Sequence, residues 1–281
     1  MQQSFIKSIE QAALAISQSD ALVILAGAGM GVDSGLPDFR GKQGFWKAYP
    51  MLEQTGHSFT DLANPEAFEK TPELAWGFYG HRLNLYRKTT PHLGFEILKD
   101  WATTRPGGYF IYTSNVDGQF QKAGFDEHSI YECHGSIHHL QSLNGKGNII
   151  SADGFEIEVD ANTLRAKDLI HSVDNGELLR PNILMFNDWY WNDTRSLAQQ
   201  QRYKDWLIPL RSRKSKKVAM IEIGAGSALP AVRSQSTMIR NWLDSTYIQI
   251  NPQLAHKADI GIALGALEAL TNINAVIEAM R

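Results

Sequence analysis

Three short stretches of the chain carry side chains that could bind a nucleotide and move a proton. Residues 27–41, GAGMGVDSGLPDFRG, follow the apolar run ALVILA. The stretches Thr113-Ser-Asn-Val-Asp117 and Glu132-Cys-His-Gly135 each follow another apolar run. Glycine allows the backbone to approach a ligand closely, and amide groups at the start of a helix can face an anion such as pyrophosphate. The imidazole of His134 titrates near neutral pH and can act as a general base.

Each of these patterns, taken alone, also has an ordinary structural explanation. Gly-x-Gly-x-Gly turns are often required for steric reasons only, and Asn-x-Asp is common turn chemistry. A histidine at the end of a strand is often simply hydrogen-bonded. Their shared position favours function, because each stretch follows a predicted strand and ligands bind beyond the carboxyl ends of parallel strands. We therefore expect the polar side chains of all three stretches to converge.

The elements that must position these residues are short strands alternating with helices. Apolar, β-rich runs occur at 21–26, 109–113, 130–133, 217–223, 246–250 and 259–264. Strands this apolar must be covered on both faces, which is typical of a parallel sheet between helices. Helical patterns occur at 74–87, 91–102 and 265–280. The predicted fold class is α/β, with a doubly wound parallel-sheet (Rossmann-like) domain.

Two stretches do not follow this alternation, and we assign them to a smaller lobe. Residues 41–72 are aromatic and loop-rich, and 137–185 contain a glycine-rich turn and an alternating, hairpin-like piece from Ile149 to Val159. The predicted nucleotide-binding domain comprises residues 1–40, 73–136 and 192–281. Two insertions, 41–72 and 137–191, form the predicted lobe.

Composition and charge exclude several classes of protein. With 281 residues, of which 43% are hydrophobic and 20% charged, the chain can bury a large core. Its net charge of −3 gives no general attraction to nucleic acid or to an anionic membrane, and we expect it to bind neither. No apolar stretch approaches the roughly 20 residues that span a bilayer, and the amino-terminal residues do not resemble a signal peptide. The single cysteine, Cys133, cannot form an internal disulfide. These features predict a cytoplasmic protein.

Taken together and in chain order, the motifs resemble those of the sirtuins, the Sir2 family of NAD-dependent protein deacylases. Residues 27–41 are similar to the family pattern Gly-Ala-Gly-(x)-Ser-x-x-Ser-Gly-Ile-Pro-Asp-Phe-Arg. Residues 113–117 resemble its Thr-Gln-Asn-Ile-Asp, and His134-Gly135 resembles its catalytic His-Gly. Ile223-Gly-Ala-Gly226 resembles its Gly-Thr-Ser turn, and Ile250-Asn251 its Ile-Asn. The matches extend over nearly the whole chain.

The resemblance implies a sirtuin-like fold and NAD-dependent removal of an acyl group from lysine, with release of nicotinamide and O-acyl-ADP-ribose. His134 would be the general base for a ribose hydroxyl, and Asn115 would orient the ribose or an ordered water. Asp117 would hold the nicotinamide carboxamide, and Phe39 would shield the exit face of nicotinamide. The implied cofactor-binding residues are Gly27, Ala28, Gly29, Asp38, Phe39, Arg40, Ser114, Asn115, Asp117, Gly224, Gly226 and Asn251. The implied partner is an acylated-lysine protein or peptide, contacted through Phe186, Asn187 and Asp188.

The chain departs from the family pattern in ways that leave the acyl acceptor open. Most sirtuins hold a structural zinc with two Cys-x-x-Cys pairs after the His-Gly, but residues 135–185 contain no cysteine, so we predict no zinc and no other metal site. Asn187-Asp188 replace the usual Gly-Glu, while Gly31 and Ser114 replace a usual serine and glutamine. With water or a protein side chain as acceptor, the same fold would give an NAD glycohydrolase or an ADP-ribosyltransferase. A catalytically silent NAD-sensing or partner-binding module is a third interpretation.

Overall fold

The parts of the chain that the computed structural model describes are residues 2–37, 49, 50, 52, 56–212, 217–226, 230–254 and 258–281. Asp38, Phe39 and Arg40, which we expected at the cofactor, lie outside these residues.

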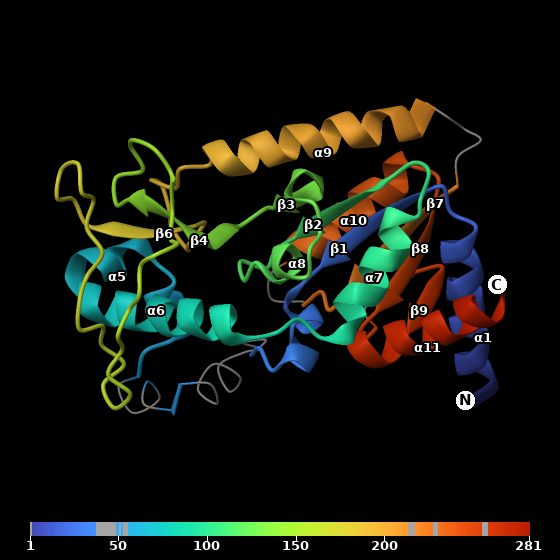
Figure 1. Cartoon of the computed structure of the whole chain (residues 1–281), viewed down its shortest axis with the longest axis horizontal. Helices are drawn as coiled ribbons and strands as arrows, with labels where there is room; N and C mark the ends of the chain where they lie inside the picture. Colours follow the sequence, from blue (N-terminus) through green and yellow to red (C-terminus); the bar gives the residue numbers. More distant parts are fainter. Residues whose placement is uncertain are drawn as a thin grey trace.

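A six-stranded parallel sheet forms the centre of the larger part of the molecule (Figure 1). The strands lie in the order β3-β2-β1-β7-β8-β9. Their bounds are β1 Ala21–Ala26, β2 Tyr109–Thr113, β3 Ile130–Glu132, β7 Val218–Ile223, β8 Ser245–Ile250 and β9 Ile260–Ile262. Every residue of β1 and β7 is buried, as in strands covered on both faces. The predicted parallel α/β fold is confirmed.

The chain order of the strands defines where a ligand should bind. From β1 the chain continues to β2 on one side, whereas β7 pairs with the other side of β1. The crossover connections therefore diverge between β1 and β7, and a doubly wound sheet binds ligands at the carboxyl edge beside this point. The first of our three sequence stretches follows β1, and the second and third begin at the last residues of β2 and β3.

Helices cover both faces of the parallel sheet (Figure 1). Their bounds are α1 Gln2–Ser17, α7 Leu93–Thr103 and α11 Ala266–Ala279 on one face, and α9 Thr194–Ser212 and α10 Ala231–Trp242 on the other. Because successive strand residues point to opposite faces, Ile221 packs with the first group and Met220 with the second. None of the helices in the described part of the chain is long and apolar enough to cross a membrane.

A second, antiparallel sheet stands beside three further helices and shares a core with them (Figure 1). Its strands, in the order β5-β4-β6, are β4 Gly135–Ser142, β5 Ile150–Ser151 and β6 Leu179–Ile183. The helices are α4 Phe59–Leu62, α5 Pro65–Lys70 and α6 Pro72–Lys88. We expected residues 73–136 with the parallel sheet, but α6 contributes Trp76 and Tyr79 to this second core. The division into two domains stays a prediction.

The alternating pattern at 149–159 predicted a hairpin, and the structure differs from that prediction. Within it only Ile150–Ser151 form a strand. The carbonyl oxygens of Phe155 and Ala152 accept hydrogen bonds of 2.6 and 2.7 Å from the guanidinium of Arg87 on α6. A side chain of α6 therefore satisfies backbone groups that a partner strand would otherwise satisfy.

The remaining described elements are single turns. They are the 3-10 turns η1 Ala28–Met30, η2 Val32–Ser34 and η3 Glu127–Ser129, and the short helix α8 Gln119–Lys122.

Candidate active site

The loops after β1, β7 and β8 lock together through backbone contacts. The amide of Gly27 donates to the carbonyl oxygen of Ile223 at 2.9 Å, and the amide of Gly29 donates to that of Gly224 at 3.0 Å. The amide of Gly224 in turn donates to Ile250 at 3.0 Å. Gly224 has a φ of +62°, and a Cβ there would lie 2.4 Å from the backbone of Gly29. Glycine is required at 224 because the two loops touch there.

The amides of Gly27 and Gly29 are already engaged, by the end of β7 and the loop after it. The expectation that Gly27, Ala28 and Gly29 cradle phosphate stays a prediction. Ala28, which lies between the two glycines, is exposed. A Cβ added at Gly226 would meet no neighbouring atom of the described chain within 4 Å. Beside the junction, the described chain therefore leaves Ala28 at the surface and space around Gly226.

Asn115 joins the loop after β2 to the loop after β1. Its side-chain amide donates to the carbonyl oxygen of Gly27 at 3.0 Å. The hydroxyl of Thr113 donates to Ala26 at 3.0 Å and accepts the Asn115 amide hydrogen at 3.0 Å, which fixes the backbone on which Asn115 stands. Asn115 and Ser114 are both half-buried. The structure therefore brings Asn115 to the glycine junction, as the sequence led us to expect.

Asp117 is a buried carboxylate at the start of α8. Its Oδ1 accepts the amide hydrogen of Gln119 at 2.9 Å. Burial raises the pKa of Asp117 to about 6, and the nearby Glu132 carboxylate acts in the same direction. That Gln119 hydrogen bond and the positive charge of Arg82, a buried residue of α6, act against this rise in pKa. Asp117 is thus a carboxyl group that changes its charge near physiological pH, unlike an ordinary surface aspartate.

His134 follows β3 directly and is half-buried. The backbone just before it is held to the end of β2, because the amide of Cys133 donates to the carbonyl oxygen of Thr113 at 2.9 Å. Burial lowers the pKa of the His134 imidazole, so the ring is neutral at physiological pH, which is the form a general base needs. The next residue, Gly135, has a φ of +78°, and a Cβ there would lie 2.1 Å from the carbonyl oxygen of Asn182. The structure therefore places His134 beside the loop that carries Asn115.

Asn251 lies beneath the loop after β7. It is 3% exposed, and its side-chain amide donates to the carbonyl oxygen of Ala225 at 2.9 Å. Its Oδ1 accepts the amide hydrogen of Gln253 at 3.0 Å. Its side chain braces the loop that contains Gly224 and Gly226, and the contact with a ribose that we expected stays a prediction.

The three expected substrate residues have different environments. Phe186 is 36% exposed, and its ring packs edge-on against Phe59. Asn187 adopts a left-handed conformation with φ +55°. Asp188 forms a bidentate ion pair with Arg180 at 2.8 and 2.9 Å, and neither side chain has any exposed surface. Asp188 therefore holds the turn after β6, and its side chain has no exposed surface with which to contact a substrate.

The backbone before this turn is already hydrogen-bonded within the chain. The amides of Leu184 and Phe186 donate to the carbonyl oxygens of His134 and Ala63, at 3.0 and 2.9 Å. The amide of Met185 points to the carboxylate of Asp188 at 3.3 Å. The amide hydrogens of Leu184, Met185 and Phe186 are therefore not available for pairing with another chain.

Two positioning residues were not identified from the sequence. Asp33 accepts the amide hydrogen of Leu267 at 2.8 Å, and so caps α11 from the loop after β1. The ring of His92 bridges the carbonyl oxygen of Met30 and the amide of Gly94, at 2.9 and 3.0 Å. Because these partners lie far from the loop in sequence, no local pattern indicates them.

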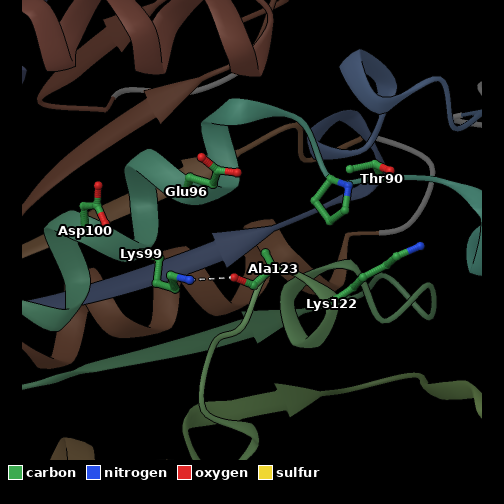
Figure 2. Close-up of a pocket in the computed structure, with 7 residues that line it drawn as sticks. Thr90, Glu96, Lys99, Asp100, Lys122 and Ala123 are labelled. Carbon is green, nitrogen blue, oxygen red and sulfur yellow. Dashed lines mark hydrogen bonds between the residues drawn. The ribbon is translucent and has the colours of Figure 1, made fainter.

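A surface pocket of about 300 Å³ lies away from these residues, between α7 and α8 (Figure 2). Its lining consists of Thr90, Pro91, Glu96, Lys99, Asp100, Lys122 and Ala123. Figure 2 shows the ammonium group of Lys99 donating to the carbonyl oxygen of Ala123, at 2.9 Å. The pocket contains none of the expected site residues. Within the described ranges, no three His, Cys, Asp or Glu side chains are placed to hold a metal ion.

The sheet order and the glycine junction define a doubly wound, nucleotide-binding type of fold. A profile of the Sir2 family matches residues 27–218. The chain therefore belongs to the Sir2 family.

Relatives of known name and solved structures agree with this assignment. An NAD-dependent protein deacylase of Deinococcus radiodurans is 28% identical over 252 residues, which cover 87% of this chain and 88% of the relative. One of Aquifex aeolicus is 40% identical over 116 residues, covering 41% of this chain and 44% of the relative. One of Candida albicans is 35% identical over 136 residues, covering 48% of this chain and 42% of the relative. The chain thus spans less than half the length of these last two relatives.

The fold itself resembles that of solved Sir2 structures. The crystal structure of a Sir2 homologue with NAD has a TM-score of 0.70 and 23% identity, covering 97% of this chain and 95% of the other. A Sir2 homologue with ADP-ribose has a TM-score of 0.71 and 24% identity, covering 96% of this chain and 97% of the other. At these identities the likeness establishes the fold.

Proposed function

We propose that this chain is an NAD-dependent protein-lysine deacylase that releases nicotinamide and O-acyl-ADP-ribose. The observation that carries the proposal is the placement of His134. His134 is half-buried, and the amide of the preceding residue, Cys133, donates to Thr113 at 2.9 Å. Asn115, two residues after Thr113, is bonded to Gly27 in the glycine junction. A neutral imidazole thus stands near the backbone where a dinucleotide would be held. The names of the Deinococcus and Aquifex relatives support the same activity.

The described residues fit NAD. Gly226 and Ala28 leave the open space that its phosphates and adenosine require, and the loop around Gly226 is braced by Asn251. Bound NAD would supply an activated ribose, because its bond to nicotinamide breaks with a neutral leaving group. Asp117 would receive the nicotinamide carboxamide, and His134 would accept a proton from a ribose hydroxyl. Asn115 would orient the ribose.

The acyl-lysine substrate would lie along the segment after β6. Leu184 and Phe186 are 40% and 36% exposed, so two apolar side chains face outward on alternate residues. Alternation of this kind suits an extended peptide added beside the segment. The amides there are already engaged, so we expect the side chains of Leu184 and Phe186 to carry more of the affinity than backbone pairing.

Product analysis tests the proposal and separates it from its alternatives. Purified protein is incubated with NAD and a panel of acyl-lysine peptides, and nicotinamide, ADP-ribose and O-acyl-ADP-ribose are measured by mass spectrometry. We expect nicotinamide release in step with peptide deacylation. Nicotinamide release without peptide, yielding free ADP-ribose, would identify an NAD glycohydrolase, and ADP-ribose attached to protein would identify a transferase. NAD binding with no product would identify a silent sensor.

We also infer a two-domain organisation and a lobe that needs no zinc. The second hydrophobic core, with Phe68, Trp76 and Tyr79, supports a separate lobe. The buried Arg180–Asp188 ion pair supports a lobe held by its own side chains. Elemental analysis of the purified protein tests the second point, and stoichiometric zinc would contradict it.

A further inference from the structure

On the outer side of β3, no neighbouring strand pairs with the backbone of Glu132. β3 lies at the edge of the sheet, and the amide of Cys133 donates inward to Thr113 on β2 at 2.9 Å. In a strand, the amide and carbonyl of one residue point to the same side, and those of the next residue point to the other side. The amide and carbonyl of Glu132 therefore point outward. An unpaired, buried backbone group of this kind is costly.

Side chains from the first turns of α9 take the place of the missing strand. The Gln199 side-chain oxygen accepts the Glu132 amide hydrogen at 3.0 Å, and the Ser196 hydroxyl donates to the Glu132 carbonyl at 3.3 Å. Arg195 donates to the Glu132 carboxylate at 2.5 Å, and the Gln199 amide group donates to the same oxygen at 3.3 Å. Backbone and side chain of Glu132 are thus both held by one face of one helix.

The same edge continues to His134, two residues on. Because successive residues of an extended chain point their carbonyl groups to opposite sides, the carbonyl oxygen of His134 points outward like that of Glu132. This oxygen accepts the amide hydrogen of Leu184 at 3.0 Å. The backbone of His134 is therefore fixed on both sides, by α9 through Glu132 and by the segment after β6 through Leu184. A shift of Glu132 along or away from α9 would move the histidine with it.

The chemistry of this contact favours a geometric role over a stabilising one. Glu132 is 1% exposed, and its Oε1 has no hydrogen-bond partner among the described residues. The Nη1 atom of Arg195 is likewise buried and without a partner there. A buried ion pair with unsatisfied atoms contributes little net stability, because desolvation offsets the attraction between the charges.

We propose that Glu132, held by Arg195, Ser196 and Gln199 of α9, is a positioning residue for His134. We call these four residues the α9 clamp. The inference rests on the proposed role of His134 as general base. In this proposal, α9, a helix outside the three sequence motifs, sets the distance between the imidazole of His134 and the ribose.

The test compares variants of neighbouring glutamines on α9. Gln199→Leu removes both of its bonds to Glu132. Gln200→Leu removes a bond of 3.1 Å to the Tyr131 hydroxyl and one of 3.0 Å from the Lys204 ammonium group, neither of which involves Glu132, and serves as the matched control. We expect Gln199→Leu to lower kcat for deacylation by roughly 10- to 100-fold, since misplacing a catalytic group by about 1 Å has effects of this size. The KM for NAD should change by less than about threefold, because the glycine junction is untouched. Gln200→Leu should leave both parameters unchanged.

Arginine variants provide the second arm, in case Gln199→Leu does not fold. Arg195→Gln should lower kcat, and Arg195→Lys should restore part of it by renewing the charge on the Glu132 carboxylate. Equal kcat in wild type, Gln199→Leu and Arg195→Gln would overturn the proposal. Equal loss in the Gln200→Leu control would also overturn it, because the effect would then be general to α9.

A spectroscopic readout separates this inference from the proposed function. ¹⁵N-imidazole NMR follows the titration of His134 without NAD or peptide. Burial lowers the pKa of His134 in the wild type, so a ring released from its position should titrate closer to its ordinary value in Gln199→Leu and not in Gln200→Leu. A wild type without deacylase activity would refute the proposed function alone. An unchanged His134 titration in Gln199→Leu would refute the clamp alone.

Discussion

The residues of the candidate site are held mostly by partners far away in the chain. The Asn115 side chain is bonded to Gly27, the backbone just before His134 to Thr113, and Asp33 to the first turn of α11. The sequence predicted the types of side chain and their positions after strands, because those follow from local pattern. It could not predict these partners, because each bond depends on the strand order of the finished sheet.

Asp117 gives a prediction at this scale. Its native pKa of about 6 lies above the ordinary 3.8, so the folded state binds the proton more tightly than the unfolded state. The stability contributed by this proton is present below pH 4 and is lost as the pH rises through about 6. Asp117→Asn keeps an oxygen to accept the Gln119 amide hydrogen and removes the charge. We expect it to raise the free energy of unfolding at pH 7.5 by up to about 3 kcal/mol.

Urea unfolding of both proteins from pH 4 to pH 8 measures this effect. The difference between wild type and Asp117→Asn should widen as the pH rises from 4 to 7. A difference that stays constant over this range would show that Asp117 is not titrating in the native protein. Turnover with NAD should fall in the same variant, because the nicotinamide carboxamide would lose its carboxylate partner.

Among the elements, the strands of the parallel sheet were the most predictable. Their runs of apolar residues have no other satisfactory place than between two layers of helices, and β1 and β7 are buried throughout. The segment 149–159 was the least predictable. One side of this segment packs on α6, which accounts for its alternation of apolar and polar residues. The side chains of Asn84 and Arg87 on α6 donate hydrogen bonds to its carbonyl groups. Alternation alone does not reveal whether a helix or a strand is the partner.

The contact between the β1 and β7 loops can be tested with two glycine variants. Gly27→Ala places a Cβ 2.7 Å from the carbonyl oxygen of Gly224, so the loops must separate, and we expect a loss of about 2 kcal/mol or more in unfolding free energy. Gly226→Ala meets no neighbouring atom of the described chain within 4 Å and should leave stability unchanged. Gly226→Phe, with a side chain much larger than the serine of the family pattern, should weaken NAD binding, because it would occupy the proposed dinucleotide space.

Thermal unfolding and NAD titration of these variants give the comparison. Normal NAD affinity in Gly226→Phe would place the dinucleotide elsewhere. Normal stability in Gly27→Ala would mean that the two loops are not in contact.

At the scale of the whole molecule, the site draws on both hydrophobic cores. The parallel sheet supplies the glycine junction and Asn115, and the backbone of His134 lies between β3 and the segment after β6. The fold class followed from the sequence, since the order of apolar runs and helices is itself typical of a doubly wound sheet. The sequence did not reveal that α6 belongs to the core of the lobe, because an amphipathic helix packs equally well against the parallel sheet and against the lobe.

The central claim is that a neutral His134 acts on NAD held at the glycine junction. Calorimetric NAD titration of wild type and His134→Ala, with deacylation of one acyl-lysine peptide measured on the same samples, tests it most directly. We predict NAD affinities within about threefold of each other and a loss of at least about 100-fold in deacylation, as expected for removal of a general base. Deacylation at the wild-type rate in His134→Ala, or no NAD binding by the wild type, would contradict the claim.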